Sequence, residues 1–194
     1  MSKKKKADGK LQPWKVLNTR ELFHAPPWVR LYKDRIELPD GDIVNDFYRV
    51  QLPEYVMVFA MSDDGKILFE RQYKHALGEV TLALPTGCIE DGESHFEAVK
   101  RELLEETGYE AEKWALVGSF MVDGNKGCGK AHFYIAKGLK KIAEPVENNM
   151  EESENVFLDI DKARKAIETG EIKLLATVAL IAIATNPAIR NNSL

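Results

Sequence analysis

The chain has 194 residues, which is enough for one well-packed domain but short for two. Hydrophobic residues make up 44% and charged residues 30%, a composition that excludes wholesale disorder. Lys and Arg number 27 against 31 Asp and Glu, and the resulting net charge of -4 argues against a nucleic-acid-coating protein, because neutralising phosphates requires a basic surface. Two cysteines, Cys88 and Cys128, are too few for a disulfide-rich fold or a four-cysteine zinc site, so we expect reduced thiols and a cytoplasmic location.

Residues 1–10 are predicted to form a disordered, lysine-rich tail. The four lysines Lys3–Lys6 follow Met1 and Ser2 without an apolar segment, so the pattern is not that of a secretory signal. The longest apolar stretch, residues 172–184, contains Lys173 and is shorter than the ~20 residues that a membrane-spanning helix requires. We therefore expect neither a membrane nor a nucleic acid as a partner.

Residues 11–55 are predicted to form an N-terminal region of antiparallel strands, and residues 56–190 the main domain. Residues 30–38 and 43–50 alternate between apolar and polar side chains around a Pro-Asp-Gly turn. Two stronger strands are expected at residues 55–60 and 66–70. The segment between them ends at Gly65, and glycine accepts the positive φ that a tight hairpin turn requires.

After residue 93 the pattern changes to a helical one. Ser94 and Glu97 form a capping box at the start of a helix, and Gly108 supplies a left-handed stop after Thr107. Further strands are expected near residues 114–121, 132–136 and 155–158, and helices over residues 161–168 and 174–185. Mixed strands and helices of this order predict an α+β fold, an α/β/α sandwich with one core.

The helix of residues 94–107 carries three acids on one face. At about 100° per residue, Glu106 falls about 40° from Glu102 and Glu105 at about 300°, beside an apolar stripe that would pack on a sheet. Carboxylates crowded in this way repel one another, so the face is either solvated or holds a hard divalent cation. Arg101 lies one turn before Glu105 and can hold that carboxylate in place.

The loop before this helix completes a recognisable motif. Gly87 and Gly92 allow a tight turn that brings peptide groups close to a ligand. Gly87, five residues, Glu93, seven residues and then residues 101–109, Arg-Glu-Leu-Leu-Glu-Glu-Thr-Gly-Tyr, resemble the Nudix box at every defining position. The resemblance extends over roughly residues 55–185 and implies the family's α/β/α sandwich.

The resemblance also implies a metal-dependent hydrolase. Glu102 and Glu106 would be metal ligands, with Glu105 as a further ligand or base and the carbonyl of Thr86 or its neighbour completing the site. Mg²⁺ would be the cofactor and Mn²⁺ a substitute, since clustered cations neutralise a diphosphate and activate water. Arg101 would act with Glu102 and Glu105 in catalysis. Three further residues would shape the loop: Gly87, Glu93 and Gly108.

The general base stays open at this point. Three acids of a later loop are candidates besides Glu105: Glu151, Glu152 and Glu154. A solvated acidic turn is the alternative for that loop.

Other segments resemble the ADP-ribose/nucleoside-diphosphate-sugar pyrophosphatase branch. They are the N-terminal strands, the Arg71-Gln-Tyr-Lys74 segment, residues 84–87 and the end of the box. This resemblance implies a homodimer and a nucleotide-sugar substrate. Candidate substrate-binding residues are Arg71, Lys74, Trp28 and Asn125, each with a plain surface, core or turn role as its alternative.

Two departures from that branch leave the sugar and the nucleotide open. Ala83 stands where the branch often has Glu, and residues 121–131 form a glycine-rich loop in place of the usual one. His132 is predicted to be a strand residue rather than a catalyst. The expected reaction is hydrolysis of ADP-ribose or a related compound to a nucleoside monophosphate and a sugar phosphate. A non-catalytic binding module, a nucleoside triphosphate hydrolase and an enzyme that removes RNA caps are the alternatives.

Overall fold

The computed structural model describes residues 11–146 and 152–188, which divide into two compact units. The first unit contains the residues up to Pro53 together with Met121–Lys130, and the second contains Glu54–Phe120 and the residues from Ala131 onward. The expected tail of residues 1–10 lies outside the described residues.

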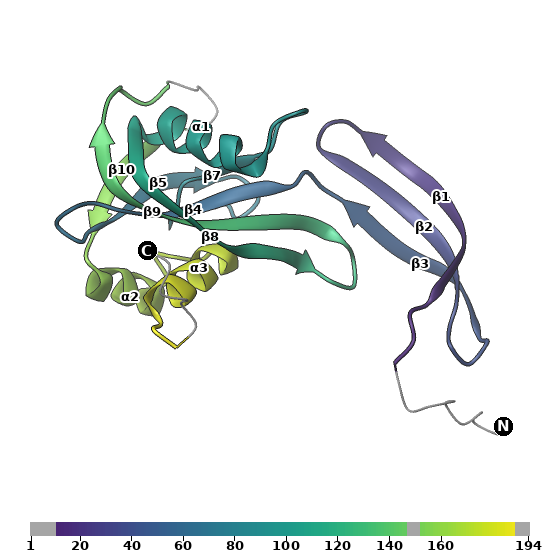
Figure 1. The fold of residues 1–194 in the computed structure, drawn as a ribbon. Coiled ribbons are helices and arrows are strands. Elements are labelled where there is room, and N and C mark those ends of the chain that lie inside the picture. The colour runs from purple at the N-terminus through teal and green to yellow at the C-terminus, as the bar shows by residue number, and fades with distance from the viewer. Residues whose placement is uncertain (1–10, 147–151, 189–194) are drawn as a thin grey trace. The chain divides into compact units, whose positions relative to one another are not determined.

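The first unit is built on a three-stranded antiparallel sheet in the order β1-β2-β3 (Figure 1). Its strands are β1 (Lys15–Ala25), β2 (Val29–Glu37) and β3 (Ile43–Gln51). The expected turn between β2 and β3 contains Gly41 with φ 90°. The sequence predicted strands within residues 11–55 but not the limits of β1, because nearly all residues of β1 are exposed and a strand without a buried face carries no period-two signal.

A buried carboxylate ties these three strands together. Asp34 on β2 is 1% exposed and accepts a 2.7 Å hydrogen bond from the hydroxyl of Thr19 on β1. The guanidinium of Arg49 on β3 donates to the same carboxylate and lies 5.1 Å from the ring centre of Tyr32. Hydrogen bonds from Arg49 hold the pKa of Asp34 below its usual range. A charged pair therefore occupies the middle of a sheet that has little apolar core.

The second unit contains a mixed sheet in the order β10-β5-β4-β9-β8, with β6 beside β5 and β7 beside β4. Its strands are β4 (Tyr55–Met61), β5 (Ile67–Lys74), β6 (Glu79–Ala83), β7 (Thr86–Cys88), β8 (Tyr109–Asp123), β9 (Cys128–Lys141) and β10 (Ser153–Leu158). The central strand β4 runs parallel to β9 and antiparallel to β5 and β7.

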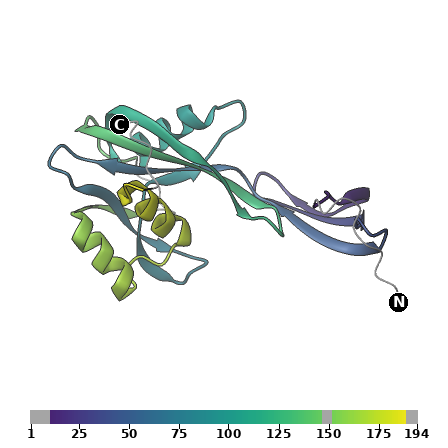
Figure 2. The same ribbon diagram turned by 60° about the horizontal axis from the view of Figure 1, so that its bottom comes forward.

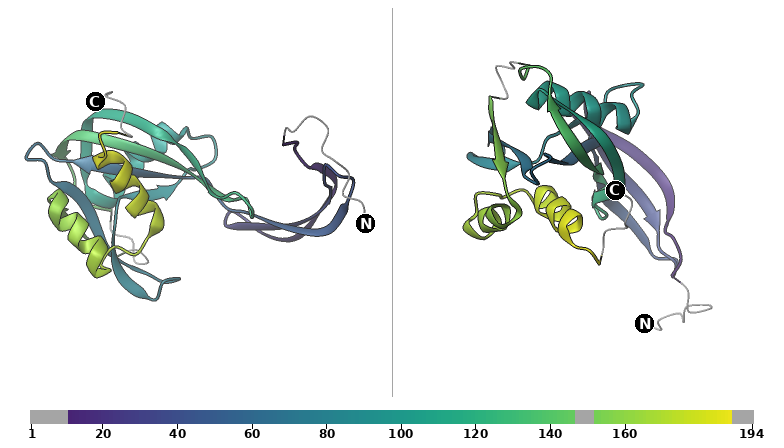
Figure 3. Two further views of the ribbon diagram at one scale, coloured as in Figure 1. Left: turned by 90° about the horizontal axis from the view of Figure 1, so that it is seen from below. Right: turned by 60° about the vertical axis from the view of Figure 1, so that its left-hand side comes forward.

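Helices cover both faces of this sheet. Figures 2 and 3 show α1 (His95–Thr107) on one face, and α2 (Ile160–Thr169) and α3 (Leu175–Thr185) on the other. Successive residues of β4 alternate between the two layers: Val56 and Val58 pack with α1, whereas Met57 and Phe59 pack with α2 and α3. The α/β/α sandwich predicted from the sequence is confirmed.

The ends of α1 match the sequence signals. Ser94 accepts a hydrogen bond from the backbone N–H of Glu97, whose side chain accepts one from the backbone of Ser94. Gly108 ends the helix with φ 78°, and a Cβ there would lie 2.2 Å from the carbonyl oxygen of Ala143. Both constraints fix where the acidic face of α1 begins and ends.

Within the described part of the chain, no helix is both long enough and apolar enough to span a membrane.

Candidate functional site

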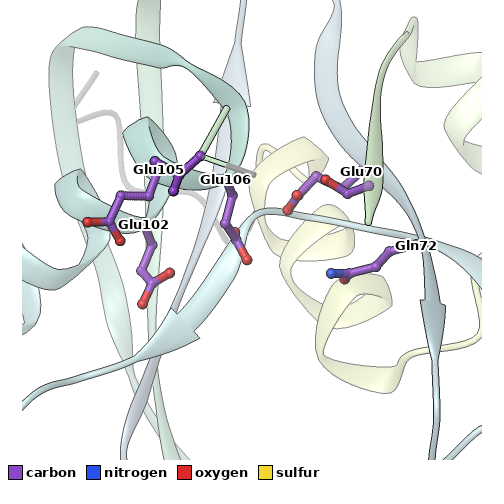
Figure 4. A pocket seen from close by; sticks show the side chains of 7 residues that line it. Glu70, Gln72, Glu102, Glu105 and Glu106 are labelled. Atoms are coloured by element: carbon purple, nitrogen blue, oxygen red, sulfur yellow. The ribbon is translucent and has the colours of Figure 1, made fainter. Parts of the chain in front are cut away.

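Residues of α1 and β5 line a pocket of about 110 Å³ in the second unit (Figure 4). Its lining residues are Glu70, Gln72, Glu102, Glu105, Glu106, Val146 and Ser153. Four carboxylates in so small a volume dominate its chemistry. The pocket is smaller than the roughly 300–1,000 Å³ that houses a drug-sized ligand, so it suits a cation and phosphate oxygens rather than a whole nucleotide.

Arg101 organises the acids of α1 around the preceding loop. Its guanidinium donates two hydrogen bonds to Glu93, at 2.9 and 3.0 Å, and one to the carbonyl oxygen of Cys88 at 3.0 Å. The Nη1 group also donates to Glu102 at 2.8 Å and to Glu105 at 3.1 Å. Hydrogen bonds from Arg101 hold the pKa of Glu93 below its usual range, and those to Glu93 raise the pKa of Arg101. One cation thus fixes three carboxylates.

Glu106 lies between the loop at β7 and strand β5. Its Oε2 atom accepts a 2.9 Å hydrogen bond from the backbone N–H of Thr86. Burial, the charge of Glu70 and a hydrogen bond with Glu70 together raise the pKa of Glu106 well above its usual range. Figure 4 shows the side chains of Glu106 and Glu70 extending toward each other from α1 and β5. Two carboxylates in contact are unfavourable together unless a proton or a cation neutralises part of their charge.

The loop at β7 touches two of the three box acids. Thr86 bonds Glu106, and a Cβ built on Gly87 would lie 1.9 Å from Cδ of Glu102. The carboxylate of Glu102 therefore lies directly against the Gly87 backbone, where any other residue would displace it. The hydroxyl of Thr86 anchors the loop by donating a 2.7 Å hydrogen bond to the carbonyl oxygen of Val56.

The donor set suits a hard divalent cation. Carboxylate and carbonyl oxygens are the ligands that Mg²⁺ and Ca²⁺ prefer, and the Glu70–Glu106 pair carries negative charge that a cation would neutralise. Over residues 11–146 and 152–188, no three His, Cys, Asp or Glu side chains already form a metal ligand set. Arg101 accounts for part of this arrangement, because it holds Glu102 and Glu105 toward itself.

Besides Val146 and Ser153, two pocket residues of β5 were missed in the sequence, Glu70 and Gln72. Both are buried, 2% and 4% exposed, on a strand where they alternate with Phe69 and Arg71. The available signal was an acid directly after the apolar run of residues 67–69, at a position that a fully buried strand fills with an apolar residue.

None of the four candidate substrate residues lines the pocket. Arg71 alternates with Glu70 and Gln72, so it lies on the other face of β5, where its Nε is 3.7 Å from Glu154 of β10. Lys74 shares the face of Glu70. Trp28, which is 67% exposed, and Asn125 belong to the first unit.

Asn125 lies in a turn that Asp123 closes. The carboxylate of Asp123 accepts hydrogen bonds from the backbone N–H groups of Asn125 at 2.8 Å and Lys126 at 3.0 Å. The Asp123 side chain therefore stabilises the β8–β9 turn itself.

The remaining candidate bases lie outside the pocket. Glu152 and Glu154 are exposed, whereas Ser153 between them lines the pocket, and Glu151 lies outside the described residues. His132 is a buried residue of β9, as predicted. Its ring nitrogens lie 2.8 Å from the hydroxyl of Ser119 and 2.8 Å from Glu54.

Comparisons with known proteins agree with this geometry. A methanol dehydrogenase activator of Bacillus methanolicus is 34% identical over 152 residues, which span 78% of this chain and 79% of that protein. An ADP-ribose pyrophosphatase of Bacillus subtilis is 30% identical over 154 residues, spanning 79% and 83%. A crystal structure of an ADP compounds hydrolase superposes with a TM-score of 0.74 at 21% identity, over 89% of this chain and 92% of that one, and shares the fold.

Two family profiles match adjacent parts of the sequence. The nucleoside diphosphate sugar hydrolase N-terminal domain matches residues 14–50, and the NUDIX domain matches residues 52–178, which hold every acid of the pocket. The chain belongs to the Nudix family.

Proposed function

We propose that this protein hydrolyses the diphosphate bond of a nucleoside diphosphate sugar, with ADP-ribose as the first candidate. The observation that carries this proposal is the pocket lined by Glu102, Glu105 and Glu106, of which Glu102 and Glu106 also contact the Thr86–Gly87 loop. Relatives whose names state ADP-ribose hydrolysis, and the matched N-terminal domain, support the substrate class.

The residues proposed to hold the cation are Glu102, Glu105, Glu106 and the carbonyl of Thr86. We infer Mg²⁺ as the cofactor, with Mn²⁺ as a substitute, because the donors are all oxygen atoms. When bound, the metal neutralises the diphosphate and lowers the pKa of a water molecule. Arg101 acts as a positioning residue, since its hydrogen bonds set the starting orientation of Glu102 and Glu105.

The reaction balances as a hydrolysis. The water oxygen bonds to one phosphorus, the bond from that phosphorus to the bridging oxygen breaks, and the bridging oxygen leaves with the other phosphate. The water proton passes to a base, for which Glu105 is the nearest candidate, because it lines the pocket and its side chain is 47% exposed. The products are a nucleoside monophosphate and a sugar phosphate.

The groups on either side of the diphosphate need contacts beyond the small acidic pocket. We propose Lys74 and Arg71 for phosphate or ribose, Trp28 for stacking on a nucleobase, and Asn125 as a further contact with the substrate. The N-terminal region, residues 11–55, is proposed as a separate element that forms a homodimer, because it exposes large apolar side chains: Trp14, Val16, Phe23 and Trp28.

A substrate panel with Mg²⁺ and product identification tests the proposal. We expect ADP-ribose or another nucleoside diphosphate sugar to be cleaved, and ¹⁸O-water to label one of the two phosphate products and so identify the bond broken. Release of pyrophosphate from nucleoside triphosphates without cleavage of diphosphate sugars would contradict the substrate class. Binding of a nucleotide sugar without turnover would show a non-catalytic module.

A further inference from the structure

One acid of the pocket belongs to the sheet and not to the box helix. Glu70 lies on β5, directly opposite Asn155 of β10 on one side and Ala83 of β6 on the other. Its neighbour Leu68 packs in the α1 layer and Phe69 in the α2/α3 layer, so Glu70 faces α1. Residues directly opposite each other share a face, so the three positions form a row beneath the end of α1.

The surroundings of Glu70 are unfavourable for an acid that serves only to stabilise the fold. The side chain is 2% exposed, and the contact it makes with Glu106 places a second acid against it. Burying like charges together is disfavoured unless a proton or a cation compensates them. A packed apolar residue would fill the same position without this penalty.

The two residues beside Glu70 in this row, Ala83 and Asn155, differ in what they offer. Ala83 leaves space beside the carboxylate, and Asn155 offers a hydrogen-bond acceptor. Ala83 presents only a methyl group opposite Glu70, so no large side chain from β6 covers the carboxylate. On the other side, the amide nitrogen of Asn155 donates to the carbonyl of Thr107 at 2.8 Å, while its buried Oδ1 atom has no hydrogen-bond partner. A buried acceptor without a donor indicates a place for an electropositive group such as an ion or a water.

We propose that Glu70 is a further ligand of the divalent cation, supplied by β5 across the pocket from the acids of α1. This inference rests on the proposed function, because it takes the cation from there. Glu70 and Glu106 then bind the cation from the sheet and from the helix, on two sides of the same pocket. The carboxylate at this row of the sheet comes from β5, while the facing position on β6 is alanine.

This assignment is tested by measuring the binding of Mn²⁺ to the full-length protein. Calorimetry and electron paramagnetic resonance are the two measurements. Glu70→Gln keeps the shape and the hydrogen-bonding capacity toward Glu106 but removes the charge. We expect Mn²⁺ affinity to fall by about tenfold or more. The circular dichroism spectrum of the metal-free protein should be unchanged, and its Tm should not fall. Glu168→Gln, the same change on exposed α2, is the matched control and should bind Mn²⁺ like the original protein.

A second variant moves the carboxylate from β5 to the facing position on β6. Glu70→Ala combined with Ala83→Glu places the acid on the facing strand, and we expect it to bind Mn²⁺ more tightly than Glu70→Ala alone. A folded Glu70→Gln protein with unchanged Mn²⁺ affinity would overturn the assignment. So would a folded double variant that binds no better than Glu70→Ala.

Glu106→Gln, measured in parallel, separates this inference from the proposed function. If Glu106→Gln loses Mn²⁺ binding and diphosphate cleavage while Glu70→Gln keeps its Mn²⁺ affinity, only the assignment of Glu70 fails. If the unaltered protein binds Mn²⁺ but cleaves no diphosphate, and Glu70→Gln weakens that binding, the cation site stands and the proposed function fails.

Discussion

The backbone N–H of Thr86 donates a 2.9 Å hydrogen bond to Oε2 of Glu106, joining β7 to the end of α1. Glu106 also contacts Glu70, so its carboxylate is held from the loop and from the sheet. Groups held by such supporting contacts lose little freedom when a ligand binds, which favours a geometry built before the cation arrives.

Glu106→Gln tests the central acid. Glutamine keeps the Thr86 hydrogen bond but removes the charge, so we expect turnover to fall at least about 100-fold, or roughly 2.7 kcal/mol of transition-state stabilisation. The Tm in a chelating buffer should be unchanged or higher, because the variant removes the repulsion with Glu70. Near-normal turnover in a folded protein would remove Glu106 from the metal site.

Gly87→Ala tests the contact between the loop and Glu102. A methyl group at this position would lie 1.9 Å from Cδ of Glu102, so that carboxylate has to move. We expect weaker Mn²⁺ binding, by about tenfold, in calorimetry. Gly124→Ala, whose Cβ would meet nothing within 4 Å, is the control and should bind Mn²⁺ normally. Equal affinity in both variants would show that the position of Glu102 does not matter.

Arg101→Lys separates charge from geometry. An ammonium group keeps the positive charge but cannot make the forked hydrogen bonds to Glu93, Glu102 and Glu105 at once. We expect a lower kcat with a smaller change in KM, and a loss of about 1–3 kcal/mol in the free energy of unfolding. Urea denaturation and steady-state kinetics measure the two effects. A variant that loses stability but keeps its kcat would assign Arg101 to the fold alone.

Asp34 gives the first unit a pH dependence with a definite sign. Its pKa is lowered in the folded protein by Arg49, so the stabilisation is complete above the unfolded pKa of about 3.9 and is lost as the pH falls through the folded value. Asp34→Asn should lower the free energy of unfolding by about 1–3 kcal/mol at pH 7. That difference should shrink toward pH 3 in denaturation curves. A difference that stayed constant across this range would contradict the role of the ionised pair.

The homodimer can be tested with light scattering. We expect a dimer at micromolar concentration and no change when residues 1–9 are removed. Charged substitutions of Phe23 and Trp28, which are 54% and 67% exposed, should shift the protein toward monomers. A monomeric original protein would contradict the proposed interface.

The sequence predicted the parts of the fold whose signals are local. The capping box at Ser94 and the left-handed Gly108 act within one helical turn, so the limits of α1 were readable. The alternation of apolar and polar residues on either side of Gly41 and Gly65 likewise predicted two hairpins. The limits of β1 were not predicted, because its burial pattern has no period.

The site was predictable only where its residues are neighbours along the chain. Glu102, Glu105 and Glu106 share one helical face, and Arg101 reaches them from the same helix. Glu70 enters the pocket through strand pairing and through the packing of α1 on the sheet, which are long-range events. An acid among apolar residues was the sole local sign of it.

The parallel pairing of β4 with β9 means that the centre of the sheet can form only late in synthesis. Tyr55–Met61 pairs with Ala131–Lys137, so α1 and β8 leave the ribosome before the strand that completes the centre of the sheet. Until then, one hydrogen-bonding edge of β4 stays open while its antiparallel partners can already form. Closing such a long loop carries an entropic cost that local contacts do not repay, which slows folding. The nascent chain therefore exposes an apolar strand edge until β9 emerges, and this is the interval in which a chaperone has the most to protect.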